Sequence, residues 1–326
     1  MIEVKHLTKR YGDHTAVSDL TFSVEEGQVY GFLGPNGAGK STTMNIMTGC
    51  LAATSGEVTI GGYDIFEDAK QAKRLIGYLP EQPPVYLDRT PWEYLTFVAR
   101  AKGIPQKEIE GQIHKAMEAT GIGHVAHRLI KNLSKGYKQR VGIAQALLGD
   151  PKVIILDEPT VGLDPAQMIE IRNLIHDLGK THTVILSSHI LSEVQTVCDR
   201  VLIIAHGKLV AQGTPEELAG KLAAKGTISA TAQGERDAVL AAAATVPGLT
   251  DLRVTAEKGG EVSFTAVSES GADLRGALSL ALAKAGCPVL NLRAESMSLE
   301  DVFLQLTEAP EETETTETKT NEQEAE

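Results

Sequence analysis

Residues 31–42 read GFLGPNGAGKST, a glycine-rich stretch that ends in a lysine and two hydroxyl side chains. The stretch matches the pattern G-x-x-x-x-G-K-[ST] at Gly34, Gly39, Lys40 and Ser41. In this pattern backbone N–H groups surround a phosphate chain and the lysine neutralises its outer charge. An apolar run precedes the loop, and a helix beginning near Lys40 would point its positive end at the phosphates. The stretch therefore predicts a phosphate-binding loop between a strand and a helix, the alternative being a simple glycine-rich turn.

Composition places the chain among globular proteins. It has 326 residues, 42% of them hydrophobic, which suffices for the core of one large domain or two smaller ones. Its three cysteines are widely spaced without a pattern, which suggests neither a disulfide framework nor a zinc site and fits a reducing cytosol. The net charge is −12, and residues 308–326 contribute more than half of it through eight glutamates against one lysine. We find no basic footprint for nucleic acid.

The sequence also gives no sign of a targeting or membrane-spanning segment. The N-terminus MIEVKHLTKRYG has no apolar core of signal-peptide length. No stretch reaches the ~18 to 20 apolar residues that a helix needs to cross a bilayer. We therefore expect a chain that does not itself span a membrane.

Strand-like and helix-like segments alternate before residue 222, which is typical of an α/β fold. The expected strands are residues 29–34, 56–62, 75–81, 152–157, 181–188 and 200–207. The last three have unbroken apolar runs, which suit a sheet covered on both faces. Thr90 has the properties of an N-cap, with Pro91 at the first helical position and Glu93 three residues after the cap. Residues 83–150 stay helical in pattern, so a helical insert interrupts the α/β core.

An acidic pair follows one of these apolar runs, in VIILDEPT at residues 153–160. A strand ending in Asp157 and Glu158 places two carboxylates at the carboxyl edge of a parallel sheet, where such sheets bind ligands. Asp157 would serve a magnesium ion and Glu158 a water molecule. An acidic pair after a strand is also a common helix cap. Its combination with Lys40 favours the site over the cap.

A third motif, LSKGYKQRVGIAQALLGDP at residues 133–151, lies between the other two, and SSH occupies residues 187–189. With GPNGAGKST and ILDEPTVGLDP, these motifs make residues 1–220 resemble the nucleotide-binding subunit of an ATP-binding cassette (ABC) transporter. The resemblance implies a P-loop NTPase cassette that hydrolyses ATP with Mg²⁺. The variant wording GYLPE with LSKGY resembles the gliding-motility-like exporters, whose permease is a separate chain.

The resemblance assigns roles to individual positions. It implies that ATP is bound by Gly34, Pro35, Asn36, Gly37, Ala38, Gly39, Lys40, Ser41 and Thr42. Ser41, Asp157 and Glu81 would hold the magnesium ion. Because the family commonly has a glutamine at this last site, Gln82 is the alternative to Glu81. A carboxylate can bind magnesium but cannot donate an amide hydrogen bond.

Ser134 and Gly136 match the signature-loop positions that, in the family, touch the γ-phosphate of ATP held by the opposite subunit. Physically, Ser134 would cap the following helix and point its dipole outward. The alternative is a well-capped surface helix, which Gly136 in the first turn disfavours. The chain departs from the usual signature, since Lys135 and Tyr137 replace a glycine and a glutamine.

Three further positions carry roles by resemblance, each with a structural alternative. Tyr11 would stack on adenine, or it packs on the surface at the end of a strand. Asp164 lies in a loop that links the two active sites in the family, and Asp followed by Pro165 is also an N-cap and first-turn pair. His189 would be a catalytic residue that bonds the γ-phosphate, although a lone histidine is often structural.

The character of the sequence changes after residue 222. Residues 227–306 read as strand, helix, strand, strand, helix and strand, with a hairpin turn at Gly259-Gly260. This order predicts a small ferredoxin-like α+β domain, followed by a helix capped at Ser298. A regulatory, dimer-supporting or permease-contacting role is open for it. The acidic tail of residues 308–326 is too poor in apolar residues to fold, so we expect it to be disordered.

We therefore expect a cassette at residues 1–222 that dimerises around ATP, as a homodimer, and drives a separate membrane permease from the cytoplasmic face. One alternative is a non-transport ATPase of the same fold, which usually needs a long coiled coil or two cassettes in one chain. Another is a regulator that binds nucleotide without turnover. The sequence indicates neither the transported substrate nor the direction of transport.

Overall fold

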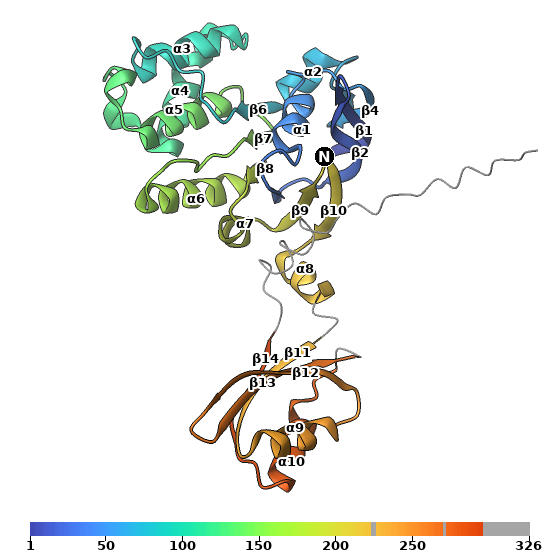
Figure 1. Cartoon of the computed structure of the whole chain (residues 1–326). Helices are drawn as coiled ribbons and strands as arrows, with labels where there is room; N and C mark the ends of the chain where they lie inside the picture. The colour runs from blue at the N-terminus through green and yellow to red at the C-terminus, as the bar shows by residue number, and fades with distance from the viewer. Residues whose placement is uncertain (223–225, 270–271, 296–326) are drawn as a thin grey trace, which may run out of the picture.

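The computed structural model describes residues 1–222, 226–269 and 272–295 (Figure 1). The helix predicted at Ser298 and the acidic tail of residues 308–326 lie outside the described residues. Within the described part of the chain, no helix is both long enough and apolar enough to cross a bilayer.

A six-stranded sheet with strand order β10-β9-β3-β8-β7-β6 forms the centre of the first 222 residues. Its strands are β3 (Val29–Leu33), β6 (Ile76–Leu79), β7 (Val153–Leu156), β8 (Thr183–Ser188), β9 (Arg200–Ala205) and β10 (Lys208–Gly213). All neighbouring pairs are parallel except β10 with β9. Every residue of β7 and β8 is buried, as the unbroken apolar runs predicted.

Hydrophobic clusters cover both faces of this sheet. On one face lies an antiparallel sheet of order β2-β1-β4-β5, with β1 (Ile2–Tyr11), β2 (His14–Val24), β4 (Ser55–Ile60) and β5 (Tyr63–Asp64). Side chains of both sheets and of α1 (Lys40–Met47) share one cluster, in which Phe22 meets Phe32 edge to face with ring centroids 5.2 Å apart. On the other face pack α6 (Pro165–Gly179) and α7 (Leu191–Val197). Short helices α2 (Ala69–Arg74) and α8 (Pro215–Leu222) precede β6 and follow β10.

The predicted helical insert lies between β6 and β7 and forms a lobe with its own hydrophobic cluster (Figure 1). Its helices are α3 (Pro91–Ala101), α4 (Gln106–Thr120) and α5 (Lys135–Leu147), with 3₁₀ turns at Gly123–Val125 and Ile130–Asn132. The cap predicted at Thr90 is confirmed. Glu93 N–H donates to Thr90 Oγ1 at 3.2 Å, and Thr90 N–H donates to the Glu93 carboxylate at 3.0 Å.

Residues 226–295 form a separate antiparallel sheet of order β12-β13-β11-β14. Its elements are β11 (Gly226–Gln233), α9 (Arg236–Ala244), β12 (Leu249–Lys258), β13 (Glu261–Ser268), α10 (Arg275–Lys284) and β14 (Val289–Glu295). This is the element order that the sequence predicts. Gly259 and Gly260 both have left-handed φ angles, 63° and 81°, as a two-residue hairpin turn requires. Phe264, Leu278 and Leu282 belong to the core of this unit.

Candidate active site

The glycine-rich loop between β3 and α1 passes unusually close to neighbouring backbone. A Cβ at Gly34 would overlap the carbonyl oxygen of Ile204. A Cβ at Gly39 would lie 2.5 Å from the carbonyl oxygen of Ala16, and Gly39 has a left-handed φ of 102°. Both positions therefore require glycine, because any side chain would push the loop away from its supports.

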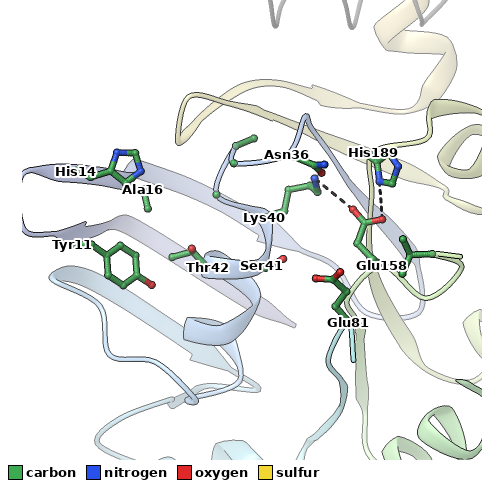
Figure 2. A pocket seen from close by; sticks show the side chains of 14 residues that line it. Tyr11, His14, Ala16, Asn36, Lys40, Ser41, Thr42, Glu81, Glu158 and His189 are labelled. Atoms are coloured by element: carbon green, nitrogen blue, oxygen red, sulfur yellow. Dashed lines mark hydrogen bonds and ion pairs between the residues drawn. The ribbon is translucent and has the colours of Figure 1, made fainter. Parts of the chain in front are cut away.

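The loop opens into a cleft of about 460 Å³ at the carboxyl edge of the six-stranded sheet (Figure 2). The cleft is lined by loop residues 36–42 together with Tyr11 from β1, Glu81 after β6, Glu158 after β7 and His189 after β8. Parallel strands end at the same edge, which is why side chains far apart in the sequence meet here. Most of the predicted site residues therefore come together in one chain.

Lys40 is held at the base of this cleft and is only 6% exposed. Its Nζ donates to the carbonyl oxygens of Gly34 at 2.7 Å and Pro35 at 3.2 Å. The Glu158 carboxylate lies 3.6 Å from the same Nζ. Burial lowers the pKa of Lys40 below its ordinary value, and the charge of Glu158 opposes this shift. The ammonium is thus incompletely solvated, which suits it to pairing with an anion.

The acidic pair after β7 is buried and fixed from the adjacent strand β8. The hydroxyl of Ser187 donates to Asp157 Oδ1 at 2.6 Å and accepts the Glu158 backbone N–H at 2.7 Å. Ser41 Oγ also donates to Asp157 Oδ1, at 3.1 Å. Glu158 has a left-handed φ of 46°, which is uncommon outside glycine. Ser187 therefore helps to hold an unfavourable backbone conformation at the carboxylate that faces the cleft.

The Glu158 carboxylate also faces His189. Glu158 Oε2 lies 3.0 Å from His189 Nδ1, within hydrogen-bond distance, while the other oxygen faces Lys40. Figure 2 shows this carboxylate between the ammonium and the imidazole. A carboxylate held in this way is oriented to accept a proton from a water molecule in the cleft.

Glu81, rather than Gln82, faces the cleft. Glu81 is among the lining side chains, and in the described part of the chain Gln82 is not. The Glu81 charge also opposes the lowering of the pKa of Lys40, after the larger contribution of Glu158.

The oxygen donors at this edge fit a magnesium ion that is shared with a phosphate. Ser41, Asp157 and Glu81 offer one hydroxyl and two carboxylates, and Ser41 already contacts Asp157. Among the described residues, no three or more His, Cys, Asp or Glu side chains gather into a complete metal site. Mg²⁺ commonly takes one or two carboxylates and completes its shell with substrate phosphates and water.

Tyr11 lies at the opposite end of the cleft from Glu158 (Figure 2). Its residue surface is 49% exposed, and Lys9 Nζ lies 5.1 Å from the ring centroid. Tyr11 is thus half exposed beside the cleft, with the Lys9 ammonium over its ring, and adenine stacking stays a prediction.

The signature-loop residues and Asp164 do not line this cleft in the described part of the chain. Ser134 caps α5, since its Oγ accepts the Tyr137 backbone N–H at 3.4 Å. Asp164 caps α6, since its Oδ1 accepts the Gln167 backbone N–H at 2.9 Å. A Cβ at Gly136 would lie 2.7 Å from Gln167 Oε1. The capping interpretations are confirmed, and the predicted ATP contacts of these residues stay predictions.

Sequence reasoning missed three buried residues behind the cleft, namely Thr160, Ser187 and Glu193. Ser187 could have been found, because it is the second-last residue of β8, beside β7 and at the register of the acidic pair. The contacts of Glu193 come from tertiary packing and have no signal in the local sequence.

Known proteins with similar sequences include a matching family and ATP-binding proteins of bacteria. Residues 17–161 match the family model described as "ABC transporter". The chain is 34% identical to the linearmycin resistance ATP-binding protein LnrL of Bacillus subtilis, over 94% of this chain and 98% of LnrL. It is 43% identical to the bacitracin transport ATP-binding protein BcrA of Bacillus licheniformis, over 64% and 68% of the two chains.

A solved structure shares the cassette. It is the dimeric, post-hydrolysis state of the ATP-binding cassette MJ0796 bound to ADP and Pi. Its TM-score is 0.59 at 25% identity, and the match covers 66% of this chain and 98% of that one.

Proposed function

The chain belongs to the ABC transporter family of ATPases, and from that premise we propose that two copies close around two ATP molecules and that hydrolysis reopens them. A separate membrane permease converts this motion into transport. The observation that carries the proposal is the separation of the predicted ATP contacts. Lys40 and Glu158 lie in the cleft, whereas Ser134 and Gly136 lie outside it, at the start of α5. A second copy would supply the missing contacts, and the dimeric MJ0796 cassette supports this arrangement.

The residues of the cleft divide the chemistry among them. Lys40 and the backbone N–H groups of the loop bind the phosphate chain and neutralise charge as it develops. Glu158 orients the attacking water and accepts its proton, while His189 aligns Glu158 and bonds the terminal phosphate. Ser41, Asp157 and Glu81 would hold Mg²⁺, which neutralises phosphate charge when bound. All of these groups already lie at the carboxyl edge of the six-stranded sheet.

The remaining site residues complete binding. Tyr11 stacks on the adenine, which its place in the cleft lining and its half-exposed residue surface support. Ser134 and Gly136 of the second copy approach the γ-phosphate through the N-terminus of α5. Asp164 caps α6 and lies in the loop that would connect the two sites.

An aromatic surface on the helical lobe supports a permease contact. Tyr86, Leu87 and Phe97 are each about half exposed, at 48%, 51% and 52%. The rings of Tyr86 and Phe97 lie 5.4 Å apart, beside a hollow of about 630 Å³. This surface begins five residues after Glu81, so a shift at the cleft can reach it through a short segment. We infer that a cytoplasmic segment of the permease docks here.

Docking can be tested with Tyr86→Ser and Phe97→Ser. Each should weaken co-purification with the permease and leave ATP hydrolysis by the isolated chain unchanged. Phe66→Ser is the matched control, because Phe66 is 42% exposed and lies outside the aromatic surface. Unchanged co-purification of both aromatic variants would place the permease elsewhere.

The domain organisation is part of the proposal. It comprises a cassette at residues 1–222 with a helical subdomain at about 83–150, an accessory domain at 227–306, and a disordered acidic tail at 308–326. The strand order β12-β13-β11-β14, with two helices in its hydrophobic cluster, supports a ferredoxin-like accessory domain. The permease would hold the cassette at the cytoplasmic face of the membrane. The names of LnrL and BcrA support export of antibiotic-like compounds, and the stretches GYLPE and LSKGY support the gliding-motility-like type of exporter.

Glu158→Gln tests the proposed function. The amide keeps the shape of the carboxylate but cannot accept a proton, so turnover should fall by roughly 10²- to 10⁴-fold. ATP binding should persist, and the dimer should accumulate in size-exclusion chromatography with ATP. Glu170→Gln, an exposed glutamate on α6, serves as control. Normal phosphate release by Glu158→Gln would contradict the assigned base, and no release by the unaltered chain would indicate a silent regulator.

A further inference from the structure

Glu193 is a buried carboxylate that the proposed chemistry does not use. It lies in the first turn of α7, and only 3% of the residue surface is exposed. A buried carboxylate is costly unless its oxygens accept hydrogen bonds. Its partners therefore indicate which parts of the molecule it holds together.

Glu193 joins hydroxyl groups from two segments, the loop after β7 and the end of β8. Its Oε2 accepts from Thr160 Oγ1 and from Ser188 Oγ, both at 2.8 Å, and both hydroxyl residues are buried. Its Oε1 lies 3.4 Å from Arg172 Nη2 on α6. Ser188 Oγ in turn accepts the backbone N–H of Ile190 at 2.9 Å, which fixes the turn after β8. One carboxylate oxygen thus ties the segment after β7 to the end of β8.

The tied segments carry the two side chains that face each other in the cleft. Thr160 follows Glu158 by two residues, and Ser188 directly precedes His189. Glu158 Oε2 and His189 Nδ1 lie 3.0 Å apart. Because Glu158 has a left-handed φ of 46°, the surrounding structure must maintain its conformation. Hydrogen bonds to an ionised acceptor are strong, so the tie can supply this support.

We propose that Glu193 is a positioning residue for ATP hydrolysis, which sets the placement of Glu158 relative to His189 through Thr160 and Ser188. The inference rests on the proposed roles of Glu158 and His189. Glu193 itself does not line the cleft in the described part of the chain. Its effect should therefore fall on the chemical step and leave ATP binding intact.

Thr160→Val tests the tie, because valine keeps the shape of threonine and removes the hydroxyl. The kcat should fall about tenfold, because small displacements of reacting groups cost rate, while KM and ATP affinity stay within about twofold. Thr160→Ser keeps the hydroxyl and should retain kcat within about twofold of the unaltered protein. Glu193→Ala should lower kcat at least as much as Thr160→Val. Glu193→Gln should lower it less, because the amide oxygen still accepts both hydroxyls.

Thr120→Val is the matched control. Thr120 is fully buried, and its Oγ1 donates to the Ala116 carbonyl at 2.7 Å within α4. Loss of the Thr120 hydroxyl should lower the melting temperature about as much as Thr160→Val does and leave kcat unchanged. An equal loss of kcat in both valine variants would assign the effect to general stability and overturn the proposal.

A comparison with Glu158→Gln distinguishes failure of the Glu193 role from failure of the proposed function. Normal kcat in Thr160→Val and Glu193→Ala, with Glu158→Gln inactive, would overturn the role of Glu193 alone. Normal turnover in Glu158→Gln would overturn the proposed function and this inference with it.

Discussion

Replacement of Lys40 by methionine should weaken ATP binding strongly and leave the stability of the fold nearly unchanged. Methionine keeps most of the apolar stem and removes the ammonium. Without nucleotide, the change removes the ion pair with Glu158 and the hydrogen bonds to Gly34 and Pro35, each bond worth about 1.5 to 3 kcal/mol because the donor is charged. It also removes the cost of burying a charge, which the lowered pKa of Lys40 reveals. We expect these effects to offset each other, so that the free energy of unfolding changes by about 1 kcal/mol or less.

The effect on ATP binding should be far larger. An ammonium at the base of the loop can form two hydrogen bonds to phosphate oxygens, each worth about 1.5 to 3 kcal/mol because both partners are charged. Their loss corresponds to roughly a 10²- to 10⁴-fold weaker affinity. Fluorescence titration with an ATP analogue measures the affinity, and thermal unfolding without nucleotide measures the stability.

Lys73→Met is the control for the Lys40 substitution. Lys73 is exposed, and its Nζ donates to the Gly49 carbonyl at 3.0 Å, beyond the other end of α1. This variant should bind ATP like the unaltered protein. If Lys40→Met also bound ATP within about threefold of the unaltered protein, the phosphate-binding role of the loop would be refuted.

Two further substitutions test the loop and a buried lysine. Gly39→Ala combines a left-handed φ with a contact 2.5 Å from the Ala16 carbonyl oxygen, whereas a Cβ at Gly37 meets nothing within 4 Å. In denaturant unfolding, Gly39→Ala should therefore lower the free energy of unfolding by about 1 to 3 kcal/mol more than Gly37→Ala does. Equal losses in the two variants would count against the close approach. Burial lowers the pKa of Lys102 to about 8 from 10.5, and its Nζ donates to the Leu148 carbonyl at 2.7 Å. Between these pH values the unfolded chain binds more protons, so stability contributed by Lys102 rises with pH. Lys102→Met should lack this rise in denaturant unfolding at pH 8 and 10.5, and an unchanged pH dependence would contradict the shift.

The sequence predicted those parts of the fold that depend on local patterns. The strand, glycine loop and helix around Lys40 were predicted because backbone geometry and phosphate chemistry require those residues at that spacing. The buried strand before Asp157 and the capped helix at Thr90 were predicted for similar reasons. Strand β2 was not among the predicted strands, because Ser18 and Asp19 interrupt its apolar alternation.

Parts of the site that depend on tertiary contacts could not be predicted. Thr160, Ser188 and Glu193 meet only because β7, β8 and α7 pack together. The preference for Glu81 over Gln82 likewise depends on which side chain turns toward the cleft after β6. No periodicity or spacing in the sequence indicates either the contacts of Glu193 or the orientation of Glu81.

The shared ATP site is tested most directly by mixing two inactive variants. Lys40→Met removes the phosphate charge partner, and Ser134→Arg places a bulky side chain at the N-terminus of α5. Each alone should be inactive. Mixed one to one, half of the dimers should be mixed, and each mixed dimer should hold one intact site, giving up to about a quarter of the unaltered activity. Recovery of activity toward this value is the predicted result. Cross-linking should confirm that mixed dimers form. If they form and no activity returns, the result would contradict ATP sites that are shared between two copies and act independently.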